Sequence, residues 1–229
     1  MTEAEWWACN DPEWMLQFLH EPASARKLRL FVCACSRLAS ASVSHQLSEE
    51  VVKIAERYAD AEATEEELGK AQSRIWDFLE HKHPNLVPMD LRLEWYPADL
   101  AFTATFDIED LCLAVMRIPN DLAMYADEDL QPELAAFFVG QVGRLPTLMR
   151  EIFGPLPFRH VTLDLAWLTS NVVSLAQAIY DERAFDRMPF LADALEDGGC
   201  TDADILGHCR QPGEHVRGCW LVDLLLGKQ

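Results

Sequence analysis

Side chains that bind metal ions are concentrated between residue 200 and the end of the chain. They are Cys200, His208, Cys209, His215 and Cys219. Zinc takes four nitrogen or sulfur ligands in a tetrahedron, often as two close pairs, so this set is a candidate zinc site. The stretch has no C-x2-C pair and matches no standard finger spacing. Packing is therefore the alternative interpretation, since free cysteines are among the most buried residues of protein cores.

A predicted turn and a predicted final helix would position these ligands. The run 214–226 is apolar on nearly every face, which indicates a buried helix. On that helix His215 and Cys219, four residues apart, would share one face. Pro212-Gly213 indicates a turn that would fold the preceding ligands back toward that face.

A second candidate site is the thiol of Cys33, which lies four residues from both Arg29 and Arg37. On a helix these three side chains share a stripe. Two cations beside a thiol favour the reactive thiolate, so Cys33 is a candidate nucleophile or redox sensor. In the alternative interpretation the arginines pair with acidic groups of the surface or of another helix.

Asp223 interrupts the apolar run WLVDLLL near the end of the chain. A carboxylate in such a run is expected to be buried, and a buried carboxylate has to be paired or neutral. Arg217 or Arg210 would supply the partner. The pattern predicts a structural ion pair, with Arg217 as the first choice.

Apolar residues recur at helical spacing through most of the chain, which predicts an all-α, multi-helix bundle. Segment 84–97 holds three prolines and is predicted to be mostly loop, with 91–96 as the one candidate for a short strand or hairpin. The predicted helices are two within 2–21, then 25–40, one opening at Ser48, one from Thr64 to about His83, 107–116, one opening at Pro132, a short one from Pro146 to Gly154, 171–182, 189–197, one opening between Thr201 and Asp204, and 214–226.

The segment 154–164 is the strongest internal break, because it holds two prolines and a glycine. It predicts an N-terminal helical lobe of residues 1–153 and a C-terminal helical lobe of residues 154–229. We expect the two lobes to pack as one compact unit, since 229 residues suffice for a substantial core.

Acidic residues outnumber basic ones 38 to 19, which gives a formal charge of −19. Such a surface repels nucleic acid and anionic membrane and suits a basic partner protein, self-association, or simply solubility. No apolar run approaches the roughly 20 residues of a membrane span, and the acidic start lacks the basic region of a secretion signal. We expect a cytoplasmic protein whose seven cysteines are thiols or metal ligands.

Several phrases at the two ends of the chain are distinctive. They are EAEWWACNDPEWMLQFL and SARKLRLFVCACSR near the start, and AFDRMPFLADALEDGGC and DILGHCRQPGEHVRGCWLVDLLLGK near the end. In these phrases the chain resembles a large paralogous set of uncharacterised bacterial hypothetical proteins. Some of these relatives carry a second Cys after CAC, where this chain has Ser36. The resemblance implies no activity, and an expanded set of helical domains suggests variable partners by analogy.

Three functions remain open from the sequence. The first is a non-enzymatic, acidic helical interaction module, an adaptor or regulator, because the chain has no P-loop, G-x-G-x-x-G, H-E-x-x-H or G-x-S-x-G motif. The second is a zinc-stabilised domain or metalloenzyme built on the C-terminal Cys/His set. The third is an acidic mimic of nucleic acid that occupies a basic groove on another protein. No catalytic residue is assigned, and zinc is the one cofactor considered.

Overall fold

The structure of the protein is a computed structural model, and it describes residues 1–19, 23–40, 46–81, 92–107 and 132–228. These residues form helices and connecting segments and contain no strand, so the all-α prediction is confirmed. They fall into two compact units, Met1–Met149 and Arg150–Gln229. The division lies within a helix, slightly before the expected break at 154–164. None of the described helices is both long and apolar enough to cross a membrane.

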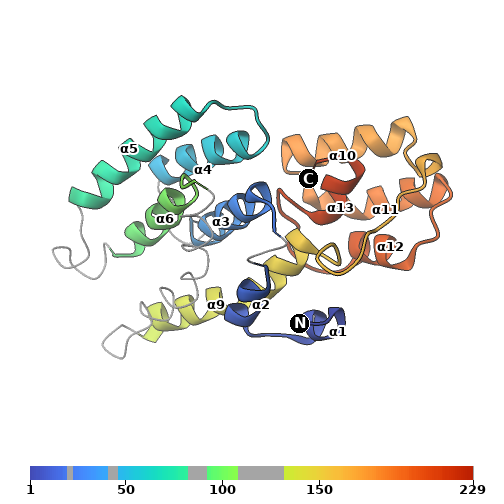
Figure 1. The fold of residues 1–229 in the computed structure, drawn as a ribbon, viewed down its shortest axis with the longest axis horizontal. Helices are drawn as coiled ribbons and strands as arrows, with labels where there is room; N and C mark the ends of the chain where they lie inside the picture. Colours follow the sequence, from blue (N-terminus) through green and yellow to red (C-terminus); the bar gives the residue numbers. More distant parts are fainter. Residues whose placement is uncertain (20–22, 41–45, 82–91, 108–131, 229) are drawn as a thin grey trace. The chain divides into compact units, whose positions relative to one another are not determined.

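The N-terminal unit is organised around one amphipathic helix, α3 (Ala25–Ser40), which is buried on most of its surface. It packs against α4 (Gln46–Ala59) and α6 (Arg92–Thr103), and α5 (Glu65–His81) packs against both of these helices (Figure 1). Two short helices, α1 (Glu3–Ala8) and α2 (Pro12–Leu19), come first in the chain.

Local signals in the sequence set the starts of these helices. Thr64 Oγ1 accepts a hydrogen bond from the backbone N–H of Glu67, and the Glu67 carboxylate accepts one from the backbone N–H of Thr64. This reciprocal pair is the predicted capping box at the start of α5, and it satisfies two N–H groups that the helix itself leaves unpaired. Ser24 Oγ likewise accepts from the N–H of Lys27 at the start of α3.

The C-terminal unit begins with the last residues of α9 (Pro132–Phe153) and continues through short helices. These are the 3-10 turns η3 (Leu165–Trp167) and η4 (Phe185–Arg187) and the helices α10 (Ser170–Glu182), α11 (Met188–Asp197), α12 (Ala203–Arg210) and α13 (Trp220–Leu225). Thr169 caps α10 and Asp202 caps α12 through side-chain oxygens. α10 packs on both α11 and α13, and α11 packs on α12 (Figure 1). Trp220, Leu221 and Leu225 of α13 lie in the core of this unit.

Three predictions about helix boundaries are wrong. The segment expected to be loop or strand is helical from Arg92, with Pro97 inside α6. Pro146 does not start a new helix, because α9 runs through it to Phe153. A proline inside a helix costs roughly 3 kcal/mol, and the apolar side chains buried after Pro146 offset that cost (Leu148, Met149, Ile152 and Phe153). The helix predicted over 107–116 falls outside the described residues.

The third error concerns the end of the chain. The predicted helix 214–226 forms only from Trp220 onward, and residues 211–219 are an irregular loop. Gly218 adopts a positive φ of 95°, a conformation that glycine reaches without strain and that a helix does not contain. His215 and Cys219 therefore do not share a helix face, and the loop itself positions them.

Candidate metal centre

Four residues from three segments of the C-terminal unit place ligand atoms in one small cluster. Glu151 comes from the last turn of α9, His208 from α12, and His215 and Cys219 from the loop between α12 and α13. One ligand atom from each residue lies within 4.8 Å of every other. We call these four residues the Glu/His/Cys cluster.

The distances inside the cluster are those of direct contact. His215 Nδ1 lies 3.0 Å and 3.1 Å from the two carboxylate oxygens of Glu151. His208 Nε2 lies 3.1 Å from Cys219 Sγ and 3.4 Å from Glu151 Oε2. The two imidazole rings meet edge to face with centroids 5.0 Å apart. Donor atoms about 2.0–2.3 Å from a zinc ion in a tetrahedron are roughly 3.3–3.7 Å apart, so the cluster has nearly the size of a zinc site.

The cluster is buried, and its carboxylate pairs with histidine rings rather than with a Lys or Arg of the described residues. The side chains of Glu151 and His215 are 3% and 5% exposed, and Cys219 is fully buried. Within the described part of the chain, Glu151 contacts two imidazoles and a thiol and no Lys or Arg. A buried carboxylate without a cation is costly. A divalent cation bound by this carboxylate, a Cys219 thiolate and two neutral imidazoles would leave the site with no net charge.

Burial also sets the protonation of the ligands. It lowers the pKa of His208 to about 4, because desolvation outweighs the attraction of Glu151. His208 is therefore neutral at pH 7, and a metal ion would not have to compete with protonation of its ring. Burial and the Glu151 carboxylate raise the pKa of the Cys219 thiol well above its usual range. Without a metal Cys219 stays a thiol, whereas a bound metal ion would ionise it.

The same facts argue against nucleophilic catalysis by Cys219. Its sulfur is within hydrogen-bond distance of His208, as in a Cys–His dyad. However, a nucleophile needs a thiolate and access to its substrate. Cys219 has a raised pKa and no exposed surface.

A close approach of α9 to α13 holds the cluster from one side. The indole N–H of Trp220 donates to His208 Nδ1 at 3.2 Å, and the two rings are 5.0 Å apart. Gly154, directly after α9, has a φ of 53° and faces this indole. A Cβ at position 154 would lie closer than 3.0 Å to three atoms of the Trp220 ring. Only glycine gives both the backbone conformation and the space that Trp220 needs.

The cluster contains three of the five predicted ligands, namely His208, His215 and Cys219. Cys200 and Cys209 are buried in the core of the same unit and lie outside the cluster. Burial, with Glu151 nearby, raises the pKa of Cys209 to about 12, which fits a packed thiol. Glu151 was not predicted, because nothing in its sequence context separates it from the other 37 of the 38 acidic residues.

The structure buries the thiol of Cys33 and places Arg29 and Arg37 close enough to interact with it electrostatically, so its reactivity stays a prediction. Cys33 is 1% exposed, and its sulfur lies 4.0 Å from the Val52 carbonyl oxygen. Arg37 makes two hydrogen bonds of 2.8 Å to the Glu56 carboxylate. Arg29 donates to the backbone carbonyls of Ala104 and Phe106, after the end of α6. Arg37 thus pairs with an acidic group of another helix, as the alternative interpretation proposed, whereas Arg29 binds backbone carbonyls.

Asp223 is buried in α13, as its place in an apolar run predicts. The guanidinium of Arg217 lies over the ring of Tyr180, 4.5 Å from its centroid. This cation–π contact anchors Arg217 within the same unit. The ion pair between Asp223 and Arg217 stays a prediction.

Comparison of the chain with known proteins finds no relative. The chain matches no protein-family model, no curated protein and no solved structure. The resemblance to a bacterial paralogous set therefore stays a prediction. A function has to be inferred from the Glu/His/Cys cluster and the rest of the structure.

Gly154→Ala should displace Trp220 and loosen the cluster. We expect a loss of about 3 kcal/mol in the free energy of unfolding, from backbone strain and overpacking together. Denaturant unfolding measures it. The matched control is Gly207→Ala, because Gly207 lies in α12 with no atom within 4 Å of an added Cβ. A Gly154→Ala protein as stable as this control would contradict the described packing of Trp220.

The metal-free protein should lose stability on acidification from pH 6.5 to pH 4. The pKa of His208 is about 4 in the folded protein and near 6.5 when unfolded, so in this range the unfolded chain binds more protons. Stability therefore falls as the pH falls, by about 3 kcal/mol from this residue. Comparing unfolding of the wild type and His208→Gln across this range isolates the effect. Equal pH dependence of the two proteins would exclude a buried, neutral His208.

Proposed function

We propose that the C-terminal unit is stabilised by one zinc ion bound by Glu151, His208, His215 and Cys219. The observation that supports this proposal is the cluster itself: four ligand atoms from four residues lie within 4.8 Å of one another in a buried site. The four ligands come from three separate segments of this unit. A metal bound by all three would hold the end of α9, α12 and the 211–219 loop together.

The ligand types favour zinc over other common cations. Magnesium and calcium take oxygen ligands, of which this cluster offers only one side chain. One thiolate, two imidazoles and one carboxylate suit a borderline-soft ion that accepts a tetrahedral arrangement. A dication also balances the two negative ligands.

The ligand count favours a structural ion over a catalytic one. Catalytic zinc keeps one coordination position open for water or substrate and usually has three protein ligands. Here four side chains are available, and all four are buried. We therefore favour a non-enzymatic, zinc-stabilised helical protein over a metalloenzyme.

Protein purified without chelators should contain one equivalent of zinc, measured by elemental analysis. Cobalt in place of zinc should give the visible bands of a tetrahedral ion and a thiolate-to-metal charge-transfer band. Cys219→Ala should abolish that band and most of the zinc, while Cys209→Ala is the control, since Cys209 is buried beside His208 but outside the cluster. Zinc should raise the free energy of unfolding by about 3 kcal/mol when free zinc is about 100 times Kd.

Less than a tenth of an equivalent of zinc, with no stabilisation when zinc is added back, would contradict the proposal. Equal zinc loss in Cys219→Ala and Cys209→Ala would point to general destabilisation rather than to a ligand. Both variants should therefore be compared for helix content before metal analysis.

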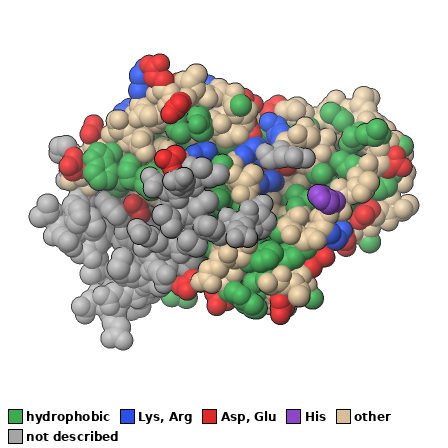
Figure 2. All heavy atoms as spheres, in the orientation of Figure 1, with side chains coloured by type: hydrophobic (Ala, Val, Ile, Leu, Met, Phe, Trp, Pro, Cys, Tyr) green, Lys and Arg blue, Asp and Glu red, His purple; other side chains and the backbone are tan. Residues whose placement is uncertain are grey.

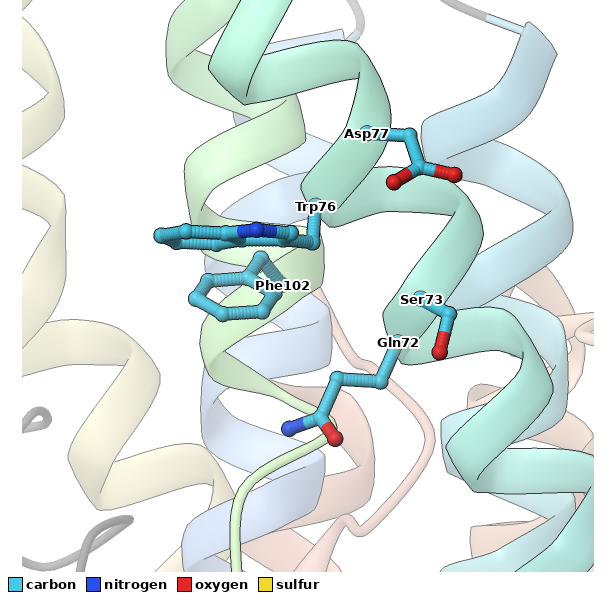
Figure 3. A pocket seen from close by; sticks show the side chains of 5 residues that line it. All are labelled: Gln72, Ser73, Trp76, Asp77 and Phe102. Carbon is cyan, nitrogen blue, oxygen red and sulfur yellow. The ribbon is translucent and has the colours of Figure 1, made fainter.

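A second candidate function, protein interaction, is favoured by an aromatic groove on the N-terminal unit. The groove is lined by side chains of α5 and α6, namely Gln72, Ser73, Trp76, Asp77 and Phe102 (Figure 3). Trp76 is 48% exposed, and its ring lies 5.3 Å from that of Phe102. Phe102 in turn packs edge to face on Phe106 at 4.9 Å. The exposed indole is thus held in place before a partner arrives, which lowers the entropy cost of binding.

The charge of the chain favours a basic partner for this groove. The formal charge is −19, and an indole face binds the guanidinium of arginine well. Both basic residues of α5 are already paired with carboxylates, Lys70 with Glu66 and Arg74 with Glu50. On the face that Figure 2 shows, Asp and Glu side chains are dispersed among other types. That dispersion favours a local arginine contact over an extended mimic of nucleic acid.

An arginine-containing peptide, such as Gly-Arg-Gly-Arg-Gly, should shift the indole NMR signal of Trp76 on titration. Trp76→Ala should weaken binding by roughly tenfold, since an aromatic contact of this kind is worth about 1 kcal/mol or more. Trp14→Ala is the matched control, because Trp14 is 45% exposed in the same unit and outside the groove. Equal affinities of the two variants would exclude the groove as the binding site.

A further inference from the structure

The hydrogen bonds of His208 outside the cluster bear on how the site takes a metal. Nδ1 of this ring accepts the indole N–H of Trp220 at 3.2 Å and lies 3.1 Å from Nε2 of Gln211. An indole N–H can only donate, so Nδ1 carries a lone pair. A neutral imidazole has one proton, which must then be on Nε2. That is the nitrogen facing Cys219 and Glu151.

A metal ion in the cluster requires the opposite arrangement. Nε2 would donate its lone pair to the metal, and the single proton of the neutral ring would move to Nδ1. Nδ1–H would then face the indole N–H of Trp220, and two donors cannot form a hydrogen bond. The Trp220–His208 hydrogen bond and a metal on Nε2 are therefore incompatible.

The two neighbours of Nδ1 differ in their ability to adjust. Trp220 is 2% exposed, and its indole lies against Gly154. The indole N–H can donate a hydrogen bond but cannot accept one. Gln211 is exposed on the loop after α12, and rotating its amide by half a turn replaces the donor with an acceptor oxygen. Gln211 can thus pair with either form of His208, whereas Trp220 pairs with one.

We infer that Trp220 and Gln211 set the metal affinity of the site in opposite directions through His208. Trp220 holds His208 in the form that protects Nε2, and Gln211 accepts Nδ1–H in the form that binds metal. Both are positioning residues, since neither contacts the metal. The inference rests on the proposed zinc site.

Substitutions at the two positions test this inference, because they should change the zinc affinity in opposite directions. Trp220→Phe removes the competing donor and should bind zinc roughly tenfold more tightly than the wild type. Gln211→Leu removes the acceptor and should bind roughly tenfold more weakly, and Gln211→Glu should restore or exceed wild-type affinity. Trp167→Phe is the control, because Trp167 packs against the same core and is not part of the cluster, and it should leave affinity unchanged. Competition with a chromophoric chelator gives the Kd values.

NMR on the wild type gives a readout that simple destabilisation would not produce. In zinc-free protein the ¹⁵N spectrum of His208 should show a protonated Nε2 and an unprotonated Nδ1, and zinc should reverse this pattern. The indole N–H signal of Trp220 should move upfield with zinc as its hydrogen bond is lost. These signals are informative even if Trp220→Phe does not fold.

The outcomes separate the inference from the proposed function. A wild type that binds no zinc overturns both. A wild type that binds zinc, with equal affinity in Gln211→Leu or with Nδ1 already protonated in the zinc-free form, overturns the inference alone.

Discussion

The central constraint on the C-terminal unit is the buried carboxyl group of Glu151. Its carboxylate lies between two imidazoles and a thiol, with no Lys or Arg against it in the described part of the chain. Water does not reach it to screen the charge, so the neighbouring groups must satisfy it. Two histidine rings can each donate one hydrogen bond to its oxygens. His215 Nε2 is also buried and has no hydrogen-bond partner among the described residues. A bound dication would supply a cation that the described Lys and Arg side chains do not, and this supports the proposed metal centre.

The surrounding structure keeps the ligands close at some cost to regular secondary structure. Residues 214–219 do not form the first part of the predicted helix, and Gly218 makes the turn that leads into α13. Gly154 lets the end of α9 approach Trp220, which contacts His208 directly. These departures from local preference lie around one cluster, which supports a specific role for that cluster.

Much of the fold follows from the sequence, because helix caps and apolar periodicity are local signals. α3 has the predicted bounds, and the Thr64 capping box forms as predicted. The errors occur where tertiary contacts override local signals. Pro146 stays inside α9, whose flanking apolar side chains are buried, and the final helix starts late. His208, His215 and Cys219 were predictable as candidates from residue type. Glu151 was not, because only the fold brings the end of α9 to α12 and to the loop that follows it.

X-ray absorption of the zinc-containing protein tests the central claim most directly, since it reports the atoms around the metal. We predict a first shell of one sulfur near 2.3 Å and three nitrogen or oxygen atoms near 2.0–2.1 Å, with the outer-shell pattern of two imidazoles. A shell without sulfur, or with two or more sulfurs, would contradict the assignment of Glu151, His208, His215 and Cys219 as the ligands.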